Sequence, residues 1–393
     1  MGKLNSMNNI HANLYTKKKM WVTWILSIIV INVLLISNIF ALSDSNYTTT
    51  MSAWDNRNNP DNISAYLQSS KFEYNLSNLP TKGSLDYRPW PDNYWPDYKR
   101  GLADRWLKIN NRRPRSKLTP NKRLVLKMRP NQIAQLSPAE KYDIYTGNFN
   151  YPLTRKELNR TRGQSPKWQG ICEGWAVASL YFKEPGPVVV ESIDGITIPF
   201  GASDIKALLS HLQAKSNNSR TYMAGNRCNK NFSVLRTTVR DSACLDVNAG
   251  AFHVITANML GIYRKGFILD RVTDLEVWNH PVFSFSSKIL GFQSPTSDAA
   301  DTTVKEAIVS TTITYTNEVG PSFYPQNSEN NAREDFHIDK EYKYILELNS
   351  TDDIVGGKWI SRDYPDFMWI QEAAKLTGTH APLARLYESS INN

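Results

Sequence analysis

The chain has 393 residues, of which 41% are hydrophobic and 11% aromatic. This is the composition of a globular protein with one large domain or two ordinary ones, and it excludes a collagen, a coiled coil and a low-complexity chain. The formal net charge of +9 does not indicate a nucleic-acid partner by itself, because the sequence has no zinc knuckle, recognition-helix signature or Arg/Gly repeat.

The N-terminal segment has the order of an export signal. Three lysines at 17–19 precede an uncharged apolar stretch at 20–42, and Ala41 and Ser43 are the small residues that signal peptidase requires. We predict a signal peptide over residues 1–43. Because the apolar stretch is also long enough to span a bilayer, an uncleaved anchor is the alternative, and in that case this segment alone touches a membrane. Both outcomes predict a secreted, periplasmic or cell-surface protein.

The next segments differ in composition. Residues 44–79 are rich in Asn, Ser and Thr, which predicts a linker or loosely packed arm, and we expect residues 80–393 to form one catalytic domain. Residues 88–98 hold aromatic side chains among prolines that forbid a helix before Asp97. Residues 99–129 hold twelve Lys and Arg against the single acid Asp104, which predicts a solvated basic surface or, as the alternative, a site for an acidic partner.

Helices are predicted early in the chain and strands late. Ser137 is a good N-cap, with Glu140 placed to complete a capping box, and Ser203 is a cap candidate for an amphipathic helix at 204–214. Strand patterns follow at residues 252–255, 267–269, 302–308 continuing into 311–315, and 342–348. This order predicts an α+β domain in which a helix that carries one catalytic group packs against an antiparallel sheet that carries the others.

The cysteine count singles out Cys172. In an oxidising compartment three cysteines pair two and leave one, and Cys228 and Cys244 lie close enough in sequence to form a disulfide. The remaining thiol, Cys172, follows a glycine-containing turn and begins a helix-compatible apolar run. Backbone N–H groups at a helix start stabilise a thiolate and supply half of an oxyanion hole, so we expect a nucleophile; a buried, inert cysteine is the alternative.

The base for such a nucleophile is expected to be a histidine. Of the six, four lie in the targeting segment, on a polar helix face or in polar or terminal surroundings, namely His11, His211, His337 and His380. His253 is predicted to begin a strand that forms a hairpin with the strand at 266–270. That hairpin would place Asp270 beside His253, as the acid that orients the base.

The order Cys172, His253, Asp270 resembles that of papain-type proteases and transglutaminases. Over most of its length the chain resembles the transglutaminase elicitor family, which are secreted acyltransferases. The resemblance rests on eight stretches, at residues 89–96, 136–143, 170–176, 250–254, 276–282, 346–348, 356–359 and 365–369. It implies a papain/transglutaminase-like α+β core with Cys172 at a helix N-terminus. Residues 277–282 are similar to the family's defence-eliciting surface peptide, from which His280 departs.

The resemblance implies transfer of a glutamine side-chain acyl group to a primary amine of lysine or a polyamine, through a thioester on Cys172. His253 would act as base and acid, and Asp270 would fix its tautomer. Asn279, which follows Trp278, is the alternative orienter, and Gln164 and Gln169 are candidates for an oxyanion donor. No cofactor or metal is expected, since the sequence has no loop of EF-hand spacing.

Two other functions fit the sequence. A cysteine protease or amidase would use the same three residues with water as the acceptor. A non-enzymatic surface adhesin or elicitor would need only the aromatic and basic segments. The hydrophobic approach that a transferase requires could come from the aromatic segment at residues 90–106.

Overall fold

A computed structural model describes residues 54–68, 70–108, 119–226, 246–271, 276–327, 336–377 and 380–392. The chain divides into the units Met1–Thr49 and Thr50–Asn393, and all described residues belong to the second. The predicted export segment and the predicted pair Cys228 and Cys244 lie outside the described residues. Within the described part of the chain, no helix has the length and apolar character needed to cross a bilayer.

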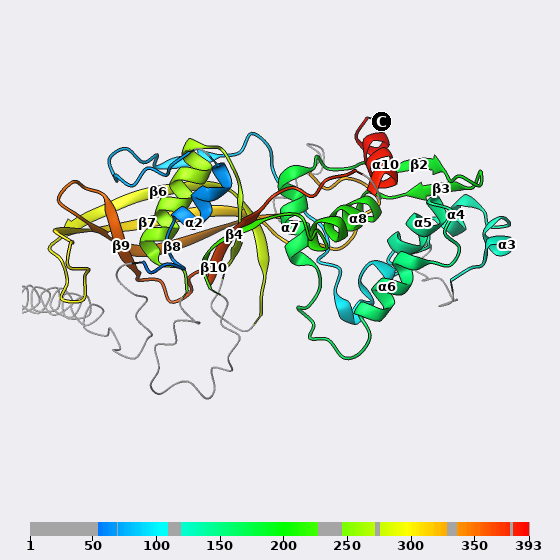
Figure 1. Ribbon diagram of the computed structural model, residues 1–393, viewed down its shortest axis with the longest axis horizontal. Coiled ribbons are helices and arrows are strands. Elements are labelled where there is room, and N and C mark those ends of the chain that lie inside the picture. The colour runs from blue at the N-terminus through cyan, green and yellow to red at the C-terminus, as the bar shows by residue number, and fades with distance from the viewer. Residues whose placement is uncertain are drawn as a thin grey trace, which may run out of the picture. The chain divides into compact units, whose positions relative to one another are not determined.

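An antiparallel sheet forms one part of the fold, and most of the helices form the other (Figure 1). In the described residues its strand order is β4-β10-β5-β6-β7-β8-β9, and β1 also pairs with β6. The strands are β1 (Lys82–Ser84), β4 (Thr221–Gly225), β5 (Phe267–Asp270), β6 (Asn279–Gln293), β7 (Lys305–Thr316), β8 (His337–Leu348), β9 (Ile354–Trp359) and β10 (Phe367–Gln371). A separate hairpin pairs β2 (Val188–Glu191) with β3 (Thr197–Phe200).

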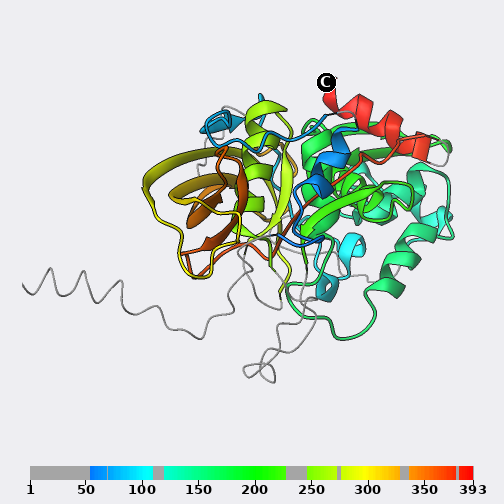
Figure 2. The ribbon, with the colours of Figure 1, turned by 60° about the vertical axis from the view of Figure 1, so that its left-hand side comes forward.

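The helices fall into two groups. Helix α9 packs against β8 and β9, and Figure 2 shows it in yellow-green beside these strands. Helix α7 contacts α8 on one side and β5 and β6 on the other, so it joins the sheet to the remaining helices (Figure 1). The helices are α2 (Asp61–Ser64), α3 (Lys122–Val125), α4 (Pro130–Ile133), α5 (Pro138–Tyr145), α6 (Pro152–Arg160), α7 (Cys172–Tyr181), α8 (Ala202–Ala214), α9 (Ala249–Thr256) and α10 (Ala381–Ile391). Short helical turns lie at η1 (Ala65–Leu67), η2 (Asp97–Lys99), η3 (Gly101–Ala103) and η5 (Ala257–Ile262).

Local capping explains the helices that the sequence predicts well. Ser137 accepts a hydrogen bond from the Glu140 N–H, and the Glu140 carboxylate accepts one from the Ser137 N–H, so α5 begins with the predicted capping box. The predicted helix at 204–214 is confirmed as α8, but it begins earlier, with Gly201 as N-cap in place of Ser203. The Asp204 carboxylate accepts from the Gly201 N–H at 2.7 Å, which draws the helix start back.

Residues 252–255 are helical, so the strand predicted at His253 is wrong. Asn248 caps α9 by accepting hydrogen bonds from the N–H groups of Gly250 and Ala251. The first turn of α9 lies directly on β9, since a Cβ on Gly250 would meet the Gly356 carbonyl oxygen at 2.3 Å. The hairpin predicted between residues 252–255 and 266–270 therefore does not exist, and β5 pairs with β6 and β10 instead.

The other predicted strands are confirmed as β5, β7 and β8. The segment predicted as a loosely packed arm differs from expectation, because its described part packs on the folded unit and buries Ile63, Phe72 and Leu79. Together the elements confirm a mixed fold of helices and an antiparallel sheet.

Candidate active site

The backbone just before α7 is held by the aromatic segment at residues 88–98. The Ile171 N–H donates to the Tyr94 carbonyl at 2.8 Å, and the Asp97 N–H donates to the Gln169 carbonyl at 2.9 Å. Gly170 permits this approach, because a Cβ there would meet the Tyr94 carbonyl oxygen at 2.3 Å. Cys172 is consequently fixed as the first residue of α7.

Cys172 is 5% exposed, and its sulfur has two polar neighbours, one just before β6 and one at the first residue of β6. The Cys172 thiol donates to the Val277 carbonyl at 3.7 Å, and Asn279 Nδ2 lies 3.5 Å from Sγ. Trp369 Nε1 donates to Asn279 Oδ1 at 2.8 Å. That bond occupies the amide oxygen and so directs the amide NH₂ toward the sulfur.

Asp270 lies on the same face of the sheet as Asn279. The two residues are direct partners in the antiparallel register of β5 and β6, and such partners project their side chains to one face. Asp270 is fully buried, and its Oδ1 accepts from the Trp278 N–H at 3.2 Å. The fold therefore brings Cys172, Asn279 and Asp270 together at the start of β6.

The thiol of Cys172 is neutral in this arrangement. Burial raises its pKa to about 12, the negative charges of Glu173 and Glu318 act in the same direction, and hydrogen bonds from Asn279 act against them. A neutral thiol matches the donated bond to Val277. Formation of the thiolate thus requires a proton acceptor when substrate enters.

His253 lies on α9 and contacts a different part of the sheet. Its Nδ1 lies 2.7 Å from the Tyr344 hydroxyl on β8, and Tyr344 in turn bonds Thr311 at 2.5 Å. Burial lowers the pKa of His253 to about 4, so the ring is neutral at physiological pH. Among the contacts of the described residues, none joins His253 to Cys172 or to Asp270, so its role as base stays a prediction.

His280, which the sequence left without a role, is the histidine found near the thiol. It follows Asn279 on β6, and its ring lies edge-on to Trp175, one turn beyond Cys172 on α7. His280 Nδ1 faces the Trp278 carbonyl at 2.8 Å, and Nε2 faces Glu318 Oε2 at 3.0 Å. Both ring nitrogens are therefore engaged away from the sulfur.

Aromatic rings flank the start of α7. Tyr94 and Trp278 pack edge to face with ring centroids 5.4 Å apart, and both are half-buried. Trp175 Nε1 donates to the Trp90 carbonyl at 3.2 Å, which ties the same segment to α7. The aromatic segment seen in the sequence thus lies beside Cys172, as a hydrophobic approach to the thiol requires.

The two predicted oxyanion donors, Gln164 and Gln169, lie in the loop between α6 and α7. Gln164 and Gln169 are exposed, and the contact that a buried oxyanion donor would need is made by Asn279. Sequence reasoning missed Trp369 and Glu318. Trp369 stands within one of the resembling stretches, at 365–369, whereas no local pattern marks Glu318.

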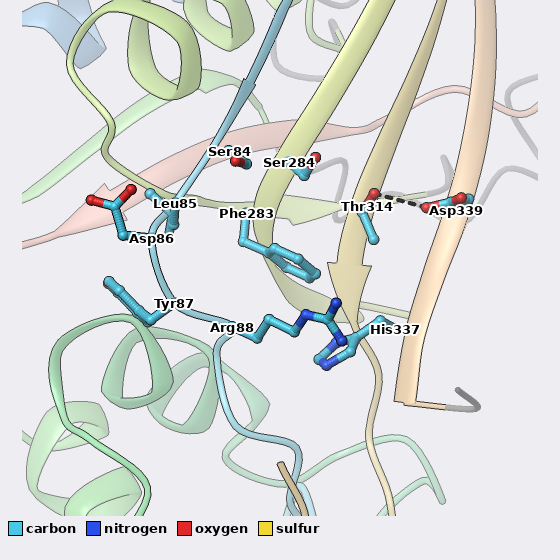
Figure 3. A pocket seen from close by; sticks show the side chains of 10 residues that line it. All are labelled: Ser84, Leu85, Asp86, Tyr87, Arg88, Phe283, Ser284, Thr314, His337 and Asp339. Atoms are coloured by element: carbon cyan, nitrogen blue, oxygen red, sulfur yellow. Dashed lines mark hydrogen bonds between the residues drawn. The ribbon is translucent and has the colours of Figure 1, made fainter. Parts of the chain in front are cut away.

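A pocket of about 520 Å³ lies at another place in the sheet (Figure 3). The side chains drawn come from β1 and the residues after it, and from β6, β7 and β8, with Arg88 and His337 close to each other. Cys172 is not among its lining residues. Burial and the charge of Arg88 lower the pKa of His337 to about 4, so this ring too is neutral at physiological pH.

Residues 277–282, which resemble an eliciting surface peptide, are mostly buried. Val277, Asn279, His280 and Val282 are each 9% exposed or less, because this stretch leads into β6 and forms the floor of the candidate site. Trp278 is half-buried.

Comparisons with known proteins agree with this fold. A sequence model of the family described as "Transglutaminase elicitor" matches residues 152–382, more than half of the chain. Among solved structures, the chain is similar to the crystal structure of the GP42 transglutaminase from Phytophthora sojae, with a TM-score of 0.64, 22% identity, and coverage of 86% of this chain and 99% of that chain. No curated protein matches the chain. The chain belongs to the transglutaminase elicitor family.

Proposed function

We propose that this protein is a protein-glutamine acyltransferase that uses Cys172 as its nucleophile. The observation that carries the proposal is the buried sulfur at the first residue of α7, faced at 3.5 Å by an amide NH₂ whose orientation Trp369 fixes. Two kinds of N–H donor, the helix start and Asn279, therefore lie near the place that the carbonyl oxygen of an acyl group on Sγ would take.

The reaction divides into two transfers with a thioester between them. In the first, Sγ attacks the carboxamide carbon of glutamine, the C–N bond breaks, and ammonia leaves with the proton that the thiol gave up. In the second, a primary amine attacks the thioester carbon, the C–S bond breaks, and Cys172 regains a proton as the amine loses one. Negative charge develops on the carbonyl oxygen in both steps, where Asn279 Nδ2 can donate to it.

This role for Asn279 differs from that of an orienter. An orienting amide would bond a histidine, whereas Asn279 bonds the sulfur and the indole of Trp369. His253 as base and Asp270 as its acid remain part of the proposal. The burial of Asp270 beside Asn279 supports its inclusion in the site.

A transferase is favoured over a protease or amidase by the surroundings of the thiol. The rings of Tyr94 and Trp278 flank the start of α7, and apolar walls of this kind limit the access of water to a thioester. An amine whose alkyl chain packs on the same rings can then compete with water for the thioester.

An elicitor without enzymatic activity is the second candidate. The name of the family includes elicitors, but the stretch 277–282 is largely inaccessible in the folded chain. Recognition of that stretch by a receptor would require an unfolded or cleaved protein. We further propose that the protein is exported, on the basis of the basic and apolar order of residues 17–42.

The proposal is tested by incorporation of a labelled primary amine into a glutamine peptide. Wild-type protein should incorporate the amine and release ammonia. Cys172→Ala should reduce both to background while circular dichroism and melting temperature show an intact fold, because the covalent route is lost. Equal incorporation by the two proteins would contradict the proposal.

A further inference from the structure

Glu318 stands beside the candidate site on a loop that two sets of contacts hold in place. It lies just after β7, whose last residue Thr316 donates through its hydroxyl to the Pro89 carbonyl at 3.0 Å. The Val319 N–H donates to the Asp92 carbonyl at 3.0 Å. The loop is therefore attached to the same aromatic segment that, through Tyr94, holds the start of α7.

Only one of the two carboxylate oxygens of Glu318 has a hydrogen-bond partner among the described residues. Its Oε2 pairs with His280 Nε2 at 3.0 Å, and the side chain is 12% exposed. Its Oε1 is buried and has no hydrogen-bond partner among the described residues. A buried carboxylate oxygen without a donor is costly, so this oxygen requires a partner that the described residues do not supply.

Hydrogen bonds place Glu318 near both the nucleophile and the aromatic wall. Its partner His280 follows Asn279, the neighbour of Sγ, and the next residue, Val319, is bonded to Asp92, two residues before Tyr94. The negative charge of Glu318 raises the pKa of Cys172, and it raises the pKa of Tyr94 as well. The charge of Glu318 does not favour formation of the Cys172 thiolate. The unused Oε1 is instead suited to a positively charged species.

We propose that Glu318 Oε1 binds the ammonium group of the acceptor amine, with the rings of Tyr94 and Trp278 packing on its alkyl chain. This inference rests on the proposed function and assigns its acceptor site. Lysine side chains and polyamines arrive as cations, and a carboxylate beside aromatic rings is suited to an ammonium on an unbranched chain. The ammonium must lose a proton before it attacks, so the bond to Glu318 contributes to affinity for the cation and not to the attack itself.

The test compares a cationic acceptor with a neutral one. With a blocked glutamine peptide as donor, Glu318→Gln should lower kcat/KM for n-butylamine roughly tenfold to a hundredfold, the range for loss of a hydrogen bond to a charged group. Hydroxylamine is largely uncharged at neutral pH, so kcat/KM for hydroxylamine should fall much less. The ratio of the two values then measures the loss of the cation site separately from any change in acylation of Cys172. The matched control is Glu341→Gln, which removes an exposed charge on β8 and should change neither acceptor.

The outcomes separate this inference from the proposed function. If wild-type protein releases no ammonia from the glutamine peptide, the proposed function fails. If wild-type protein does release ammonia, two results overturn the acceptor assignment. One is an unchanged kcat/KM for n-butylamine in Glu318→Gln, and the other is an equal loss of kcat/KM for n-butylamine and hydroxylamine. A measurement without a variant gives a second check: added salt should weaken use of n-butylamine by wild type and leave hydroxylamine unaffected, and equal responses would overturn the assignment.

Discussion

The sulfur of Cys172 lies between an acceptor and a donor. The Val277 carbonyl takes the thiol proton in a hydrogen bond, and the Asn279 amide donates toward the sulfur. The first contact favours the neutral thiol and the second favours the thiolate and the oxyanion that follows it. Trp369 Nε1 orients the Asn279 amide, but of the two residues only Asn279 donates to the sulfur.

Asn279→Ala should lower kcat for amine transfer about a hundredfold to a thousandfold with little change in KM, as loss of an oxyanion donor does. Steady-state kinetics over a range of donor peptide checks this. Trp369→Phe is the matched control, since it removes the indole N–H and leaves Asn279 in place; its loss should be much smaller. An Asn279→Ala enzyme with nearly full kcat would show that this amide has no part in the chemistry.

Helix α9 depends on a close backbone approach rather than on propensity. Gly250 lies against Gly356 and Gly357 of β9, and a Cβ on Gly250 would meet the Gly356 carbonyl oxygen at 2.3 Å. Phe252, two residues further on, packs edge to face against Tyr342, Tyr344 and Trp359. The glycine fixes the helix close enough to the sheet for these rings to meet.

Gly250→Ala should therefore lower the free energy of unfolding by about 3 kcal/mol or more, because the neighbouring atoms are backbone and cannot move aside. Urea denaturation measures the change. Gly291→Ala on β6 is the control, since a Cβ there has nothing within 4 Å, and its effect should be small. Comparable losses in the two variants would contradict the packing argument.

Elements whose signals are local were predicted correctly, and those that depend on distant contacts were not. Ser137 and Glu140 lie three residues apart, so the capping box of α5 is visible in the sequence. Residues 252–255 look like a strand because they are aromatic and β-branched. The packing on Gly356, far along the chain, makes them helical. For β6, Pro281 and Gly291 hide a long strand whose register shifts near both.

The candidate site divides in the same way. Cys172 can be proposed from the sequence because the glycine turn before it, the helix that it begins and the odd cysteine count are all local or compositional features. The contact between Asn279 and Sγ depends on how β6 meets α7, which no local pattern encodes. Glu318 could not be predicted either, because it follows β7 and its partner His280 lies on β6, far away in the sequence.

Across the whole molecule, buried ionisable groups couple stability to pH in opposite directions. His253 has its pKa lowered by burial to about 4, whereas burial raises the pKa of Asp92 and of Glu347 to about 7. The two carboxyls stabilise the fold most at low pH, and their contribution is lost as the pH rises toward 7. The histidine contribution is complete above about pH 6.5 and is lost as the pH falls toward 4, because the unfolded chain then binds the proton more readily.

The contribution of His253 is isolated by comparison with His253→Gln. The difference in unfolding free energy between wild type and variant should shrink by about 3 kcal/mol at most as the pH falls from 6.5 to 4, given the shift in pKa. Denaturation curves at several pH values measure it. A difference that stays constant over this range would mean that His253 is not buried in its neutral form.

The formation of a thioester on Cys172 tests the central claim most directly. Incubation of the full chain with a blocked glutamine peptide and no amine, followed by acid quenching and mass spectrometry, should find the peptide mass less one ammonia on the fragment that carries Cys172. Hydroxylamine should remove that mass. Ammonia release without any adduct on this fragment, or an adduct on Cys228 or Cys244 instead, would contradict the assignment of Cys172 as the nucleophile.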